Sequence, residues 1–345
     1  MNLKQAIIKH VLFDSDKQLM FLTILSAQAK VGRPLQDIFK SLSTSSNKYF
    51  RALAALSLNP NSPYFASHYG AYFNEKTAKL LVLSQKFNAV PDFIDHTLNS
   101  TDRKSLSGFW TVFVPGIQEL VLMLFLLLGF AGIYVYNPLI AESFVDLSDT
   151  FAYAIGGLLV TYFPLFSLLA AAGAGVYQYT KTRPVPVREK LKKTLGVFKH
   201  YDARFAIELF RIMSIMTQGI GGKDVSIKTI VSELSSVYGH TKYRNHQFSV
   251  IRRELAKGAK FSSALDAAGI LDKDSLDLFR GLAPYENIPE ITKASRAVAD
   301  LLASKTKAEM KFVSKNYIFG LYLILAISFI AFIELTLGGG LNAIQ

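Results

Sequence analysis

Three stretches of the chain are apolar over the length of a membrane span. Thr150–Thr180 has no charged residue, and Val112–Tyr136 has only Glu119, near one end. The 18 residues of Asn316–Ile333 would rise about 27 Å as a helix. Crossing a hydrocarbon core of about 30 Å takes roughly this length. The pattern predicts an integral membrane protein with three transmembrane helices, at 112–136, 151–179 and 316–335.

Outside these stretches, apolar residues recur at helical spacing. They include Leu19, Leu22 and Leu25 in the N-terminal part, and Leu209 and Ile212 further on. Neither part has the alternating pattern that is typical of strands. The sequence therefore predicts an all-α fold, with helical-bundle domains at 14–111 and 180–315, the second one including a basic juxtamembrane linker.

The first 13 residues predict a separate amphipathic helix. Leu3, Ile7, Ile8 and Val11 fall on one helical face. Such a helix is either the first element of the bundle or a docking helix for a partner or for the membrane surface. Ile7 and Ile8 are the candidate contact residues of the docking interpretation.

The two soluble parts share features that predict an internal repeat. Asp16 and Asp202 are each expected to head a first helix, and Val90-Pro91-Asp92 corresponds to Ile288-Pro289-Glu290, 198 residues later. Proline followed by an acid suits the first turn of a helix and complements its dipole. We therefore expect two copies of one bundle, of which the second carries additional residues.

The basic residues indicate which side of the membrane each part occupies. The chain has 38 Lys and Arg and a formal net charge of +12; 13 of these residues lie in 1–111 and 25 in 178–315. Segments 137–150 and 336–345 have none. The positive-inside rule predicts that both helical domains and the N-terminus are cytoplasmic, and that the loop and the C-terminal tail are periplasmic. The same bias accounts for the basic charge, so no nucleic-acid partner is expected.

Reactive groups in an enzyme-like arrangement are missing from the sequence. There is no cysteine, and the six histidines show no metal-ligand spacing. The segment Gly219–Asp224 is the nearest match to a phosphate-binding loop, but Thr217 stands where its first glycine should be, and Asp224 replaces the Ser or Thr. We therefore expect no catalytic, cofactor-binding or metal-binding residues and interpret this segment as a helix–helix turn.

One basic helix is the best candidate for a partner-binding surface. Val250, Ile251 and Leu255 would form its apolar side. The candidate contact residues are Arg252, Arg253, Lys257 and Lys260. The competing interpretation is a solvated helix face. Gly258 is expected to end this helix, and Ser262 to cap the next one.

Small residues recur every four positions in the second predicted span. Ser167, Ala171 and Gly175 lie on one stripe, which lets helix backbones approach closely in lipid. We expect the stripe to pack against another span, either of this chain or of a second copy.

The order of domain, span, short outer loop, span, domain and final span resembles the inner-membrane platform proteins of type IV pilus and type II secretion machines, the type II secretion F-protein family. The best local match is Ile251–Leu265, with its helix, glycine and second helix start. Family domains usually carry a Gly-Glu pair ahead of the last bundle helix. This chain has Ser84-Gln85-Lys86 and Leu282-Ala283-Pro284 there, so what it resembles is a divergent member of the family.

The resemblance implies a non-enzymatic assembly platform in the bacterial inner membrane. Its implied partners are a cytoplasmic secretion or pilus ATPase, pilin or pseudopilin subunits, other inner-membrane assembly proteins, membrane lipid and further copies of itself. The alternative is an oligomeric small transporter or channel component, which should place polar residues along its spans.

Overall fold

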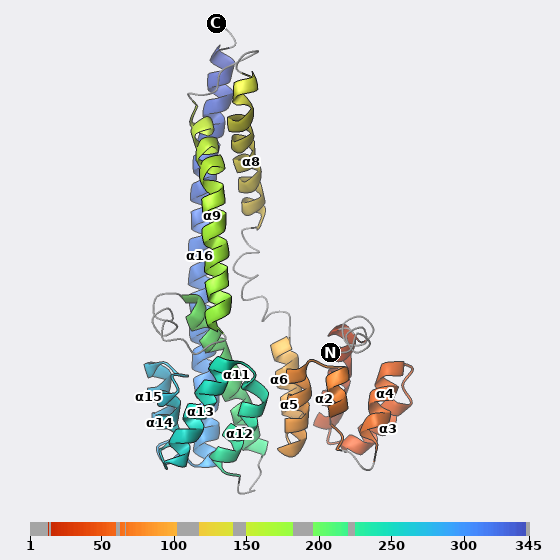
Figure 1. Ribbon diagram of the computed structural model, residues 1–345. Coiled ribbons are helices and arrows are strands. Elements are labelled where there is room, and N and C mark those ends of the chain that lie inside the picture. The colour runs from red at the N-terminus through yellow and green to blue at the C-terminus, as the bar shows by residue number, and fades with distance from the viewer. Residues whose placement is uncertain are drawn as a thin grey trace. The chain divides into compact units, whose positions relative to one another are not determined.

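The computed structural model describes residues 13, 15–59, 63–65, 67–101, 117–140, 150–181, 196–219 and 225–342 (Figure 1). In this described part all regular structure is helical, which confirms the all-α prediction. The chain divides into two compact units: Met1–Asp102 with Lys181–Thr306, and Arg103–Thr180 with Lys307–Gln345. Ile7 and Ile8 lie outside the described residues.

The first unit contains two helical segments. The N-terminal segment forms α2 (Ser15–Lys30), α3 (Leu35–Ser43), α4 (Lys48–Ser57), the 3₁₀ helix η2 (Ser67–Ala71), α5 (Glu75–Lys86) and α6 (Val90–Thr101). The second segment forms α11 (Gly196–Gly219), α12 (Ile227–Tyr238), α13 (Lys242–Ala256), α14 (Phe261–Ala267), α15 (Lys273–Leu282) and the start of α16 (Ile288–Asn342).

Local sequence explains where many of these helices begin. The side chain of the residue before the helix accepts a backbone N–H of the first turn in α4, α5, α12, α13 and α15, which satisfies an otherwise unpaired donor. The capping residues are Asn47, Asn74, Ser226, Thr241 and Asp272.

The helix-start role expected for Asp202 is wrong. Asp16 does lie in the first turn of α2, but α11 begins at Gly196, so Asp202 lies inside that helix. Its carboxylate is buried and accepts a 2.9 Å hydrogen bond from Arg244, whose guanidinium lies over the Phe205 ring. A charge this deeply buried is stable only when paired, so the role of Asp202 is to form a buried ion pair with Arg244.

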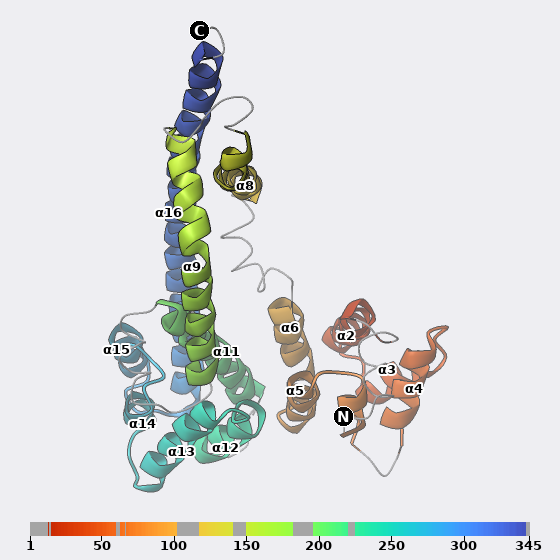
Figure 2. The same ribbon diagram turned by 45° about the horizontal axis from the view of Figure 1, so that its top comes forward.

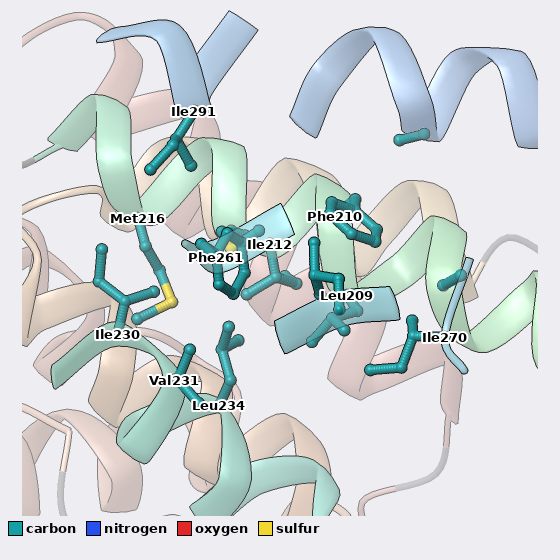
Figure 3. Close-up of a cluster of buried hydrophobic side chains, with 14 of the residues drawn as sticks. Leu209, Phe210, Ile212, Met216, Ile230, Val231, Leu234, Phe261, Ile270 and Ile291 are labelled. Atoms are coloured by element: carbon teal, nitrogen blue, oxygen red, sulfur yellow. The ribbon is translucent and has the colours of Figure 1, made fainter. Parts of the chain in front are cut away.

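Two hydrophobic cores meet in this unit. One is formed within the N-terminal segment, by residues such as Phe21, Phe39 and Phe50. The larger one is built from the second segment, where Figure 3 shows side chains of α11, α12, α14 and α16 gathered together. Burying side chains of this size stabilises each of them by about 1.5–3 kcal/mol relative to exposure.

Helices α5 and α6 contribute to both cores. Leu81 and Ile94 point into the N-terminal core, whereas Leu83 and Phe93 belong to the larger one. In both views these helices lie between α2 and the pair α11–α12 (Figures 1 and 2). The two soluble segments are therefore joined through buried apolar side chains.

A polar seam flanks this joint. Lys76 pairs with Glu208, Lys86 pairs with Glu233, and the Lys79 ammonium donates to the Ser236 carbonyl at 3.1 Å. All three lysines lie on α5, and all three acceptors lie on α11 or α12. Because these pairs are partly exposed, they contribute alignment more than stability.

The second unit consists of α8 (Ile117–Ile140), α9 (Phe151–Lys181) and the rest of α16. Two helical stretches are long and apolar enough to cross a membrane, Phe151–Val176 and Ile288–Glu334. They cover two of the predicted spans. The remaining predicted span falls on α8, whose apolar stretch Val121–Asn137 is shorter. The two long stretches support association with a membrane.

Candidate partner-binding surface

The predicted basic helix is α13, and it is amphipathic as expected. Its Val250, Ile251 and Leu255 side chains are buried, the last two in the larger core, while Arg252 and Arg253 are exposed. Thr241 caps the helix by accepting the Arg244 N–H at 3.2 Å. The buried side fixes the rotation of the helix, so the arginines face solvent.

Gly258 ends α13 as predicted. It has φ +83°, and its N–H and that of Ala259 donate to the carbonyls of Leu255 and Glu254. This double hydrogen bond from a left-handed residue is the Schellman arrangement. The turn positions Lys257, the residue directly after α13, on the exposed side.

One carboxylate moderates the charge of this face. Lys257 donates to Glu254 at 2.8 Å, and Arg253 Nε lies 3.5 Å from the same oxygen. The hydrogen bond from Lys257 lowers the pKa of Glu254, so this carboxylate stays ionised. Arg252, Arg253 and Lys257 together still outweigh it, which leaves a positive surface suited to an acidic partner.

Lys260 lies in a neighbouring depression. Its ammonium donates to the Pro284 carbonyl at 3.1 Å. The depression has a volume of about 540 Å³, and its lining consists of Lys260, Ser262, Ser263, Arg280, Ala283, Pro284 and Glu286. The four predicted contact residues therefore divide into an exposed trio on α13 and Lys260 in the depression.

The capping role expected for Ser262 is wrong. The Glu286 carboxylate accepts the N–H groups of Phe261 and Ser262, at 2.9 Å for the second. Glu286 itself has φ +55°, and its N–H and that of Tyr285 donate to Glu290. A carboxylate at a helix start satisfies free amide groups and complements the helix dipole. Because Glu286 lies 24 residues beyond Ser262, a local sequence pattern could not reveal this cap.

Tyr285 was missed by the sequence interpretation. It lies beside Pro284 in the α15–α16 loop and is 85% exposed. An exposed aromatic ring next to basic side chains is typical of residues that anchor a protein interface. The available sequence signal was an aromatic residue directly after a proline in a short connection.

The membrane stripe is exposed in the second unit. Ser167, Ala171 and Gly175 are all exposed, and a Cβ added to Gly175 would meet no atom within 4 Å. The close helix contact occurs elsewhere, because a Cβ on Gly156 would lie 2.1 Å from the Phe130 carbonyl oxygen of α8. Packing of the stripe against a second copy stays a prediction.

Other features add no chemistry to this surface. Gly219 is the last residue of α11, and the rest of the segment interpreted as a turn lies outside the described residues. Across the described ranges, no group of three His, Asp or Glu side chains could hold a metal ion. Comparisons with protein families, curated proteins and solved structures found no match to this chain.

Proposed function

We propose that this chain is a non-enzymatic assembly platform in a bacterial inner membrane, of the type IV pilus or type II secretion kind. In this role its helical unit receives mechanical work from a cytoplasmic ATPase, and its spans help pilin-like subunits to leave the membrane. The observation that carries the proposal is the confinement of all 38 basic residues to the two soluble segments, next to long apolar helices.

The proposed topology has three crossings. Helix α8 supplies the first; its 24 residues would rise about 36 Å, and its ends can extend the apolar stretch Val121–Asn137. Two crossings, joined by one short loop, separate the two basic segments, so both segments lie on the same side of the membrane. The positive-inside rule assigns that side to the cytoplasm. The shared core of the two segments supports this placement, because residues packed together must occupy the same compartment.

A repeat of the soluble segments is part of the proposal. Helices α6 and α16 begin with Val90-Pro91-Asp92 and Ile288-Pro289-Glu290, and each follows a left-handed residue, Asn88 or Glu286, at the same spacing of 198. This shared geometry supports one ancestral helix start in two copies. The position of Asp202 inside α11 removes the other sequence argument for it.

A topology reporter tests the first step. A reporter that is active only outside the cytoplasm should be active after Gln345 or near Ser143 and silent near Lys242. Activity near Lys242 would overturn the topology, and with it the platform role.

Deletion of the gene in its host tests the function itself. We expect surface filaments or secreted substrates to disappear while pilin-like subunits accumulate in the inner membrane. Normal filaments and secretion would contradict the platform proposal. In the same strain, uptake or leakage of small solutes that depended on the gene would favour the transporter or channel alternative.

The α13 trio is tested by charge reversal. Arg253→Glu with Lys257→Glu should reduce co-purification of the ATPase with the full chain by about tenfold or more, as loss of close interfacial charge pairs does. The matched control is Lys228→Glu with Lys293→Glu, two exposed basic residues on other helices. Equal loss in both variants would indicate a general charge effect and remove α13 from the interface.

A further inference from the structure

Three lysines form a ladder on α16 where the helix approaches its apolar part. Lys307, Lys311 and Lys315 are all exposed, and they are spaced by four residues. At about 100° per residue, they lie within an arc of roughly 80° on one face of the helix. Glu309 is the acidic residue among them, and it lies roughly on the opposite face. The ladder therefore presents uncompensated positive charge in one direction.

The apolar stretch of α16 ends at Glu334, and the distance from this residue gives the depth of the ladder. Phe151 donates its backbone N–H to Glu334 at 3.0 Å, and α9 runs beside α16 in both views (Figures 1 and 2). Lys315 lies 19 residues before Glu334, about 28 Å along the helix. Because the hydrocarbon core is about 30 Å thick, a boundary at Glu334 places Lys315 at the opposite boundary.

The other two lysines then fall in and beyond the headgroup layer. Lys311 lies about 6 Å further out and Lys307 about 12 Å, whereas the headgroup region is roughly 5–8 Å deep on each side.

We propose that Lys307, Lys311 and Lys315 form a binding site for the headgroup of an anionic phospholipid in the leaflet that faces the soluble segments. This inference rests on the membrane insertion proposed above. Three ammonium groups at successive depths can contact the phosphate and the outer polar part of one headgroup. Zwitterionic phosphatidylcholine offers the same phosphate but also brings a positive choline group toward the lysines, so the ladder selects for net negative charge.

The site also has a consequence for the helix that carries it. Helix α16 continues without interruption from Ile288 to Asn342. A lipid that keeps each of its lysines at a fixed depth therefore also restrains the helix along its axis. A helix that transmits force between the bilayer and a soluble unit requires such a restraint. The lipid would therefore resist axial displacement of α16.

Lipid selectivity of the full chain tests the proposal. The purified protein is reconstituted in phosphatidylcholine, and its association with spin-labelled phosphatidylglycerol is compared with that of spin-labelled phosphatidylcholine. We expect Lys307→Gln, Lys311→Gln and Lys315→Gln together to reduce the preference for phosphatidylglycerol by about tenfold or more, since each lysine near a charged surface contributes roughly fivefold. The control combines Lys228→Gln, Lys242→Gln and Lys273→Gln, exposed lysines of the first unit with the same total charge change.

Three outcomes are distinguishable. Equal preference in the triple variant and the wild type would overturn the lipid site. Displacement of phosphatidylglycerol by inorganic phosphate, but not by chloride at equal ionic strength, would assign the ladder to a soluble phosphate and also overturn it. Release of the wild-type chain from membranes by alkaline carbonate would instead refute membrane insertion, and with it the function proposed above.

Discussion

Phe210, in the first unit, is fully buried, whereas Phe163, in the second, is 66% exposed. The contrast holds throughout: the first unit buries many aromatic and aliphatic side chains, and the second buries Phe130, Ala152 and Ala331 and exposes most of its large apolar side chains. The hydrophobic effect acts on both units, so this difference supports the proposal that water surrounds the first unit and lipid surrounds the second.

Electrostatics separates the two units in the same way. The first unit holds its charged residues on the surface or in buried pairs such as Asp202–Arg244. Between Thr150 and Thr180, the second unit has no charge at all. A unit that cannot hydrate charged groups excludes them, while a unit in water uses them for solubility and recognition.

The largest expected effect compares one substitution in both units. Phe210→Ala removes a ring from the larger core and should lower the free energy of unfolding by about 3–5 kcal/mol. Phe163→Ala removes an exposed ring and should change it by less than about 0.5 kcal/mol. Urea unfolding of the detergent-purified chain, followed by protection from proteolysis, measures both. Similar losses for the two variants would refute the contrast between the units.

A second prediction uses a histidine hidden at the joint of the two soluble segments. Burial of His96 lowers its pKa from 6.5 to about 4. The charge of Glu208 raises this pKa by a smaller amount, and the charges of Arg211 and Lys76 lower it further. Between pH 6.5 and about 4 the unfolded chain binds a proton that the native chain excludes. This contribution to stability is therefore full above pH 6.5 and falls by about 3 kcal/mol as the pH drops to about 4.

The comparison with His96→Gln isolates this contribution. The free energy of unfolding of both proteins is measured in urea between pH 4 and pH 7.5, and the difference between them cancels the titration of the other groups. The variant should lose less stability than the wild type as the medium is acidified. Parallel stability curves for the two proteins would mean that His96 titrates equally in the folded and unfolded states.

A third prediction concerns packing inside the second unit. Gly156→Ala places a methyl group against the Phe130 carbonyl of α8 and should destabilise the α8–α9 contact by about 1–3 kcal/mol. Gly175→Ala meets no atom, and alanine suits a helix better than glycine, so this variant should not lower the chain's own stability. Thermal unfolding in detergent compares the pair. A larger loss of stability in Gly175→Ala than in Gly156→Ala would place the close helix contact at the small-residue stripe instead.

The smallest expected effect is the change in the chain's stability when the charges of Arg253 and Lys257 are reversed. Both side chains of Arg253 and Lys257 are exposed, and their contacts with Glu254 are surface ion pairs, so Arg253→Glu with Lys257→Glu should change the free energy of unfolding by about 1 kcal/mol or less. Urea unfolding checks this. A loss of several kcal/mol would mean that the helix face is structural, and reduced ATPase binding could no longer be attributed to recognition.

The sequence by itself determined the features that arise from neighbouring residues. The all-helical class, two of the apolar stretches, the amphipathic face of α13 and its end at Gly258 agree with the structure. Each depends on residues within a few turns of one helix, where spacing and backbone freedom decide the outcome.

Only the tertiary structure decided the features that join distant residues. Asp202 looked like the start of a helix but pairs with Arg244, 42 residues away. Glu286, which caps α14, lies 24 residues beyond the amide groups it accepts. The Gly156 contact with Phe130 and the two-sided burial of α5 and α6 likewise depend on which surfaces fit together. Spacing along one helix carries no information about the shape and charge of another, so packing alone selects these partners.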